Sequence, residues 1–234
     1  MERRVAYDHF APISAGKSIN MEKIKINYSY DNSVATIVLD DGKGNVLDHI
    51  MIDGLQYILD SFTKKDDLKL IVFEGAGKHF SFGASVEEHQ KEFAGTMLRT
   101  FHQLFYSLRD ISIPVLSKIS GQCLGGGMEL VLMGNFIFAD KTAKFGQPEV
   151  TLGIIPGYGG TQRLTQLIGR GKALELMLTA DMITAQEAKS LGLVNHVVAT
   201  RDEMMSLANS MMRKIIAQSP TAIASIIKSV NAGF

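Results

Sequence analysis

The chain of 234 residues contains one cysteine, no tryptophan and no excess of charge of either sign. Because Cys123 is alone, an intramolecular disulfide framework and a zinc site built from several cysteines are both excluded. Basic and acidic residues number 24 each, so composition gives no electrostatic signature of a nucleic acid or an anionic membrane surface as partner. A small organic ligand and a reducing compartment fit this composition better.

Long apolar runs and several common motifs are also missing. No stretch approaches the roughly 18 apolar residues that span a bilayer, and residues 1–20 lack the apolar segment of a secretory signal. The Walker phosphate loop, the dinucleotide-binding glycine pattern, the G-x-S-x-G elbow and the H-E-x-x-H zinc motif do not occur. We therefore expect a cytoplasmic protein with no membrane contact, no nucleic-acid partner and no metal, preceded by an N-terminal extension at residues 1–21.

Hydrophobic periodicity predicts an α/β core. Residues 23–40 alternate around the turn-rich Asp31-Asn32-Ser33, which indicates a β-hairpin. Stretches with helical spacing then alternate with short apolar runs that are typical of buried strands: 51–62 before 68–75, 97–111 before 114–121, and a short helix from Gly126 before 136–140. Such alternation is characteristic of repeated turns of strand and helix.

The chain becomes mostly helical after Gly159. Thr184 and Glu187 have the spacing of a capping box at the start of a helix, and Gly192 can end that helix. Ser219-Pro220 suits the start of a last helix. A methionine-rich stripe at 204–212 is more typical of a core or a subunit interface than of a cofactor site. We assign residues 22–180 to the core with the active site, and residues 181–234 to a helical region that packs on the core or on a neighbouring subunit.

The segment GQCLGGGMEL, residues 121–130, carries the first chemical signal. Three consecutive glycines between a strand and a helix allow backbone N–H groups to approach a ligand oxygen, as half of an oxyanion hole does. A glycine triplet alone more often permits only a tight turn. Glu129 changes this balance, because a carboxylate in an apolar helix is costly unless it is paired or used. It is a candidate acid or base with a raised pKa.

A second carboxylate, Glu149, lies in the glycine-bearing segment 145–160 directly after Pro148. Alone it would most often be a solvated loop residue, but two carboxylates in similar surroundings suggest one shared site. The loop at 79–89 offers Gly83-Ala84 as a source of a second oxyanion N–H. In the same loop, Ser85 and Glu88 have the spacing of a capping box, which predicts a helix start at this point.

Taken together, GGGMEL, FGQPE and GIIPGYGGTQRL occur in an order that resembles the enoyl-CoA hydratase/isomerase superfamily, the crotonases. The resemblance runs over nearly the whole chain from about residue 22. It implies an α/β fold of the crotonase type, which is a superhelix of ββα turns. It also implies that the C-terminal helical region trimerises, commonly as a dimer of trimers.

The resemblance also implies roles for individual residues. The N–H groups of Ala84 and Gly126 would form the oxyanion hole for the thioester carbonyl, and Glu129 and Glu149 would hold the nucleophilic water. The remaining residues would bind substrate: Ser81, Phe82 and Gly83 in the loop that meets the adenine end of coenzyme A, Gly125 in the glycine turn, and Gly157, whose N–H helps to place the water.

The activity that this resemblance implies is the addition of water to an enoyl-CoA thioester, as in fatty acid metabolism, with coenzyme A as part of the substrate and no separate cofactor. The presence of both glutamates favours a hydratase over an isomerase that only moves the double bond. FSFGASVEEH resembles hydratases of cyclic dienoyl-CoA, whereas PGYGGTQRL resembles the general enoyl-CoA type, and a non-catalytic acyl-CoA-binding relative is a further alternative. The chain also ends earlier than relatives that carry additional C-terminal helices, so either the sequence is truncated or part of the acyl-CoA wall is missing.

Overall fold

The computed structural model describes residues 19–63, 65, 67–89 and 91–233. All but the last three residues of the predicted N-terminal extension, 1–21, lie outside this range. Within it, the short strand β1 (Ile19–Asn20) pairs antiparallel with β2, so the end of the extension belongs to the sheet.

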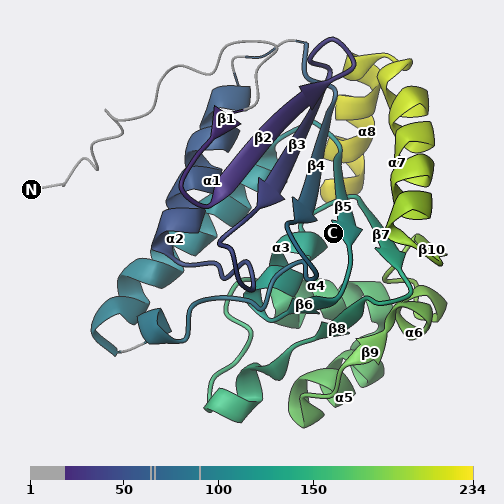
Figure 1. Cartoon of the computed structure of the whole chain (residues 1–234). Helices are drawn as coiled ribbons and strands as arrows, with labels where there is room; N and C mark the ends of the chain where they lie inside the picture. The colour runs from purple at the N-terminus through teal and green to yellow at the C-terminus, as the bar shows by residue number, and fades with distance from the viewer. Residues whose placement is uncertain (1–18, 64, 66, 90, 234) are drawn as a thin grey trace, which may run out of the picture.

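A seven-stranded sheet forms the centre of the molecule (Figure 1). Its order is β1-β2-β3-β4-β5-β7-β10, antiparallel between β1 and β3 and parallel from β3 onward. The predicted hairpin is confirmed, and so are the three buried strands that follow it. The bounds are β2 (Ile24–Ser29), β3 (Val34–Leu39), β4 (Leu70–Gly75), β5 (Val115–Ile119), β7 (Phe136–Asp140) and β10 (His196–Val198).

A smaller sheet lies next to the large one, in the order β6-β8-β9. Two of its strands continue directly from strands of the large sheet: β6 (Gln122–Leu124) follows β5, and β8 (Lys144–Gly146) follows β7. The third, β9 (Ile183–Thr184), pairs antiparallel with β8. The chain therefore repeats a strand–strand–helix unit, as the expected crotonase-like superhelix of ββα turns requires.

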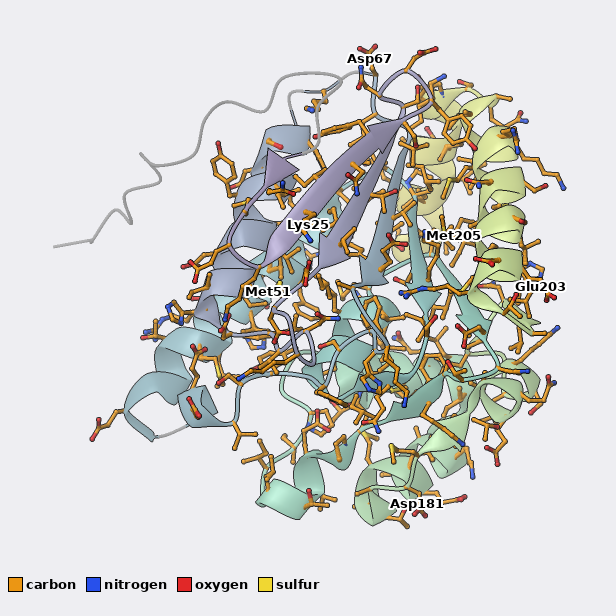
Figure 2. The ribbon with its side chains drawn as sticks, viewed as in Figure 1. Lys25, Met51, Asp67, Asp181, Glu203 and Met205 are labelled. Carbon is orange, nitrogen blue, oxygen red and sulfur yellow. The ribbon has the colours of Figure 1, made fainter. Side chains whose placement is uncertain are left out.

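Helices cover both faces of the large sheet, with α1 and α2 on one side and α7 on the other (Figure 1). The predicted methionine stripe is part of the second layer, where Met204, Ala208 and Met212 are buried against strands β3, β4, β5 and β7. Met205, labelled on α7 in Figure 2, accepts a hydrogen bond at its sulfur from the buried Lys118 Nζ at 2.9 Å. The bounds are α1 (His49–Phe62), α2 (Lys91–Asp110), α3 (Gly126–Leu132), α4 (Gly160–Ile168), α5 (Arg170–Thr179), α6 (Ala185–Ser190), α7 (Arg201–Ile216) and α8 (Pro220–Asn231), with 3-10 turns at η1 (Glu87–His89) and η2 (Pro148–Leu152).

The predicted helix boundaries in the C-terminal third are confirmed. Thr184 and Glu187 form a reciprocal capping box at the start of α6, and Gly192 follows its end with φ of 83°. Ser219 caps α8 through its side chain, with Pro220 as the first helical residue. Among the helices that the structure describes, none is long and apolar enough to cross a membrane.

The predicted capping box at Ser85 and Glu88 is wrong. No α-helix begins at Ser85; the chain forms only the short η1, and α2 starts at Lys91, earlier than the predicted 97. The Glu88 carboxylate instead accepts hydrogen bonds from the His49 backbone N–H at 3.0 Å and from the His49 ring at 2.6 Å. Glu88 thus binds the first turn of a different helix, α1.

The Asn45 side chain fixes the loop that leads to Ala84. Its amide nitrogen donates to three carbonyl oxygens, those of Ala76 at 3.1 Å, His79 at 2.9 Å and Phe80 at 3.0 Å. The residue is fully buried and has φ of 53°, a left-handed conformation that asparagine tolerates better than most residues. One side chain therefore positions the whole turn between β4 and the candidate site.

Replacing Asn45 with alanine removes the donor to these three carbonyls, of which that of Phe80 is buried, and forces alanine into the left-handed region. We expect Asn45→Ala to lower the free energy of unfolding by about 2–4 kcal/mol, measured by urea denaturation. The exposed Asn231→Ala is the control, with an expected change within about 0.5 kcal/mol. Equal effects of the two substitutions would contradict this assignment.

Candidate active site

The glycine turn between β6 and α3 places a backbone N–H at the edge of a cavity. Gly125 has φ of 51° and donates its N–H to Gly146 O at 3.0 Å, which aims the next peptide toward the start of α3. The positive φ requires glycine here, and a Cβ on Gly125 would also come 2.9 Å from Glu149 Oε1. The N–H of Gly126 then lies in the first turn of α3, at the positive end of the helix dipole.

The loop at Gly83-Ala84 brings a second N–H to the same place. Leu47 donates to Gly83 O at 2.9 Å and accepts from Ser85 N at 3.1 Å, which leaves the Ala84 N–H directed away from this pairing. A Cβ on Gly126 would lie 3.3 Å from Ala84 N, so the two N–H groups are neighbours. In the described part of the chain, neither is bonded to a protein acceptor. Two adjacent free N–H donors are an arrangement that can stabilise an oxygen that gains negative charge.

Glu129 extends from the first turn of α3 and is only 1% exposed. Its Oε1 accepts hydrogen bonds from Tyr158 N at 2.8 Å and from Gly160 N at 2.7 Å, the latter at the N-terminus of α4. A Cβ on Gly160 would come 2.9 Å from this oxygen, which explains the glycine there. Glu129 Oε2 has no hydrogen-bond partner among the described residues.

The pKa of Glu129 is raised to about 7, because burial disfavours the charged carboxylate more than the two N–H donors favour it. The negative charge of Glu149 adds to this increase. Glu129 is thus able to hold or release a proton near neutral pH.

Glu149 is 9% exposed and lies in η2, with its backbone direction set by Pro148. The Gln147 side chain, with its nitrogen facing Glu149 as the hydrogen-bond network requires, donates to both carboxylate oxygens at 3.0 and 3.1 Å. Burial raises the pKa of Glu149 to about 7 as well. The two carboxyl groups therefore titrate in the same range.

A cavity of about 630 Å³ brings most of the predicted site residues together. Both glutamates and the two candidate oxyanion donors line it, and its other walls are largely apolar, with Leu98 and Ile155 among them. The remaining predicted residues on its lining are Phe82, Gly83, Gly125 and Gly157. A second cavity of about 470 Å³ lies beneath α8 and is lined mainly by aliphatic side chains, with no carboxylate.

Ser81 does not line the 630 Å³ cavity. It is fully buried, its N–H donates to Gln122 O at 3.1 Å, and its carbonyl accepts from Leu124 N at 3.0 Å. Its hydroxyl donates to Asn45 O at 2.7 Å and accepts from Gly83 N at 3.1 Å. Ser81 thus shapes the loop from inside, while contact of this loop with the adenine end of coenzyme A stays a prediction.

Three residues of the site were not singled out by the sequence analysis. Gln147 holds Glu149, Tyr158 donates its N–H to Glu129, and His102 of α2 forms a hydrogen bond between its ring Nε2 and Gly157 O at 2.9 Å. The signal for Gln147 was its place in FGQPE, next to a candidate acid. His102 lies on an amphipathic helix, 55 residues before Gly157 in the sequence, and no local sequence pattern marks it as a site residue.

Comparison with known proteins gives a consistent family. Residues 29–234 match the sequence model of the enoyl-CoA hydratase/isomerase family. A protein of Rhizobium meliloti named a probable enoyl-CoA hydratase is 39% identical, over 80% of this chain and 73% of its own length. The short-chain-enoyl-CoA hydratase of Clostridium acetobutylicum is 34% identical, over 91% and 83%. The solved enoyl-CoA hydratase of Bacillus anthracis superposes with a TM-score of 0.86 at 34% identity, over 90% of this chain and 83% of that one.

The raised pKa of Glu129 predicts a pH-dependent stability. The folded pKa of about 7 exceeds the ordinary glutamate value of 4.5, so the group's contribution to stability is fully present below about pH 4.5 and is lost as pH rises through 7. Glu129→Gln removes this titration and keeps an oxygen for the two N–H donors. We compare the free energy of unfolding of Glu129→Gln with that of the parent chain. We expect this difference to favour the variant more at pH 8 than at pH 5, by at most about 3 kcal/mol.

Calorimetric melting temperatures at the two pH values measure this difference. Glu175→Gln is the matched control, since Glu175 is an exposed carboxylate on α5. The same pH dependence in both variants would show that Glu129 does not titrate in this range.

Proposed function

The chain belongs to the enoyl-CoA hydratase/isomerase family, and on this premise we propose that it is a hydratase that adds water across the α,β double bond of an enoyl-CoA thioester. The observation that carries the proposal is the pair Glu129 and Glu149, both with a pKa of about 7, in the same cavity as the N–H groups of Ala84 and Gly126. An acid, a base and an anion site are the three groups that this reaction requires.

The thioester carbonyl oxygen would bind between the N–H groups of Ala84 and Gly126. Attack of water at C3 moves electrons from the double bond toward this oxygen, so negative charge develops there as the enolate forms. Two fixed donors in a largely apolar cavity stabilise that charge without reorganising; one such donor is typically worth about 3–4 kcal/mol. The same donors hold the ground-state carbonyl, which orients the double bond toward the carboxylates.

Glu129 is proposed as the base and Glu149 as the acid. As the water oxygen bonds to C3, its proton passes to Glu129 Oε2, the oxygen that has no protein partner in the described chain. Glu149 delivers its proton to C2, and the enolate returns to the thioester. Solvent then restores the two starting protonation states. The reverse sequence dehydrates a 3-hydroxyacyl thioester by the same groups.

Hydration is preferred over isomerisation because the cavity contains two carboxylates. Moving a double bond needs one group that takes a proton from one carbon and returns it to another, whereas adding water needs a base for the water and an acid for C2. The trimeric assembly and the cytoplasmic location that the sequence suggests remain predictions.

The first test is incubation with crotonyl-CoA and with cyclohexa-1,5-diene-carbonyl-CoA, following the loss of conjugated absorbance. We expect turnover of at least one, with kcat highest near pH 7 because one carboxyl must be ionised and the other protonated. Glu149→Gln should lower kcat by roughly a hundredfold to ten-thousandfold, and Glu175→Gln should not. A folded protein that turns over neither thioester would refute the hydratase proposal.

The oxyanion site has its own test in Gly126→Ala. The added methyl group would lie 3.3 Å from Ala84 N, in the space that the thioester oxygen needs. We expect kcat/KM to fall roughly a hundredfold to a thousandfold. Gly171→Ala is the matched control, because no atom lies within 4 Å of the added carbon there. Full activity of Gly126→Ala would exclude this N–H pair as the oxyanion site.

A further inference from the structure

The Tyr158 side chain is held rigidly at the wall of the 630 Å³ cavity. Its ring stacks on Phe101 with centroids 4.1 Å apart and planes inclined by 14°. The ring centroids of Phe105 and His102 lie 5.9 and 6.2 Å from that of Tyr158. A Cβ on Gly126 would lie 3.3 Å from the Tyr158 ring, so the ring adjoins the candidate oxyanion donors. Because the ring is fixed, the position of its hydroxyl oxygen is fixed as well.

This hydroxyl is buried, and the structure gives it no hydrogen-bond partner among the described residues. Only three buried side-chain atoms share that condition in this part of the chain: Ser117 Oγ, Glu129 Oε2 and the Tyr158 hydroxyl. The last two belong to residues that line one cavity. A buried polar atom without a partner is costly, so two of them at one cavity point to a ligand that binds both.

Tyr158 is coupled to Glu129 through its main chain as well. Its N–H donates to Glu129 Oε1, which leaves Oε2 as the free oxygen of that carboxylate. Burial raises the pKa of the Tyr158 hydroxyl, and the charges of Glu129, Glu149 and Glu88 raise it further. It therefore stays protonated at neutral pH and is a hydrogen-bond donor.

We propose that the Tyr158 hydroxyl is a third catalytic group, which donates a hydrogen bond to the oxygen of the water whose proton Glu129 Oε2 accepts. The inference rests on the proposed hydratase function. In hydration, the donor fixes the water so that its free lone pair faces C3 while its proton passes to Glu129. In dehydration, it donates to the departing C3 hydroxyl oxygen, where charge accumulates as the C–O bond breaks. The Tyr158 O–H bond itself is not broken in either direction.

A wall residue alone would not need the hydroxyl. Phenylalanine would keep the stacking on Phe101 and the packing on Gly126, and would remove a buried polar atom that no described residue satisfies. The ring and the hydroxyl are thus separable in an experiment, because Tyr158→Phe changes only the hydroxyl.

Tyr158→Phe is expected to lower kcat for an enoyl-CoA that the parent chain hydrates by roughly tenfold, the loss typical of one hydrogen bond. KM should change less than about twofold, and the affinity for saturated butyryl-CoA should be unchanged. The melting temperature should stay the same or rise, because a buried unpartnered group is removed. Tyr106→Phe is the matched control, a half-exposed tyrosine of α2 outside the cavity lining, and it should leave every value unchanged.

An unchanged kcat in Tyr158→Phe would overturn the inference and leave the hydratase proposal standing. A melting temperature lowered by several degrees would also overturn it, since the hydroxyl would then serve a structural partner. If the parent chain hydrates no enoyl-CoA, the proposed function fails first and this inference fails with it.

Discussion

The two hydrogen bonds that Glu129 Oε1 accepts from Tyr158 N and Gly160 N determine how the rest of the site is arranged. They attach the helix after the glycine turn to the start of the next helix, α4, across about 30 residues of sequence. They also require a glycine at 160, orient the second carboxylate oxygen, and set the backbone from which the Tyr158 ring extends. A carboxylate whose charge is costly to bury is therefore also the group that organises its surroundings.

Backbone atoms, more than side chains, supply the candidate binding groups of this cavity. The two candidate oxyanion donors are main-chain N–H groups, and an added Cβ at Gly125 or Gly160 would come within 2.9 Å of a glutamate oxygen. Several side chains instead hold these groups in place through hydrogen bonds. Gln147 bonds to Glu149, His102 to Gly157 O, and Asn45 to the loop before Ala84. The proposed chemistry thus depends on how accurately a few loops are held by groups outside the proposed substrate contacts.

The strands and helices with strong periodicity, the capping box at Thr184 and the burial of Glu129 could all be predicted from sequence because each is set by neighbouring residues. The expectation at Ser85 failed because Glu88 reaches His49, 39 residues away, and this contact replaces a local cap. The strand β10 was missed because three residues give too short a pattern. Tyr158 was read only as part of a motif, since the stacking that fixes its ring comes from a helix distant in sequence.

The Asn45 amide also bears on the order in which the molecule assembles. Its three acceptors lie 31 to 35 residues further along the chain, beyond α1 and β4. Forming this contact closes the loop that contains α1 and β4, and closing a long loop carries an entropy cost. We therefore expect a refolding chain to order the turn that presents Ala84 only once this loop has closed. Recovery of activity is accordingly expected to trail recovery of β-structure, with the anion site among the last features to become ordered.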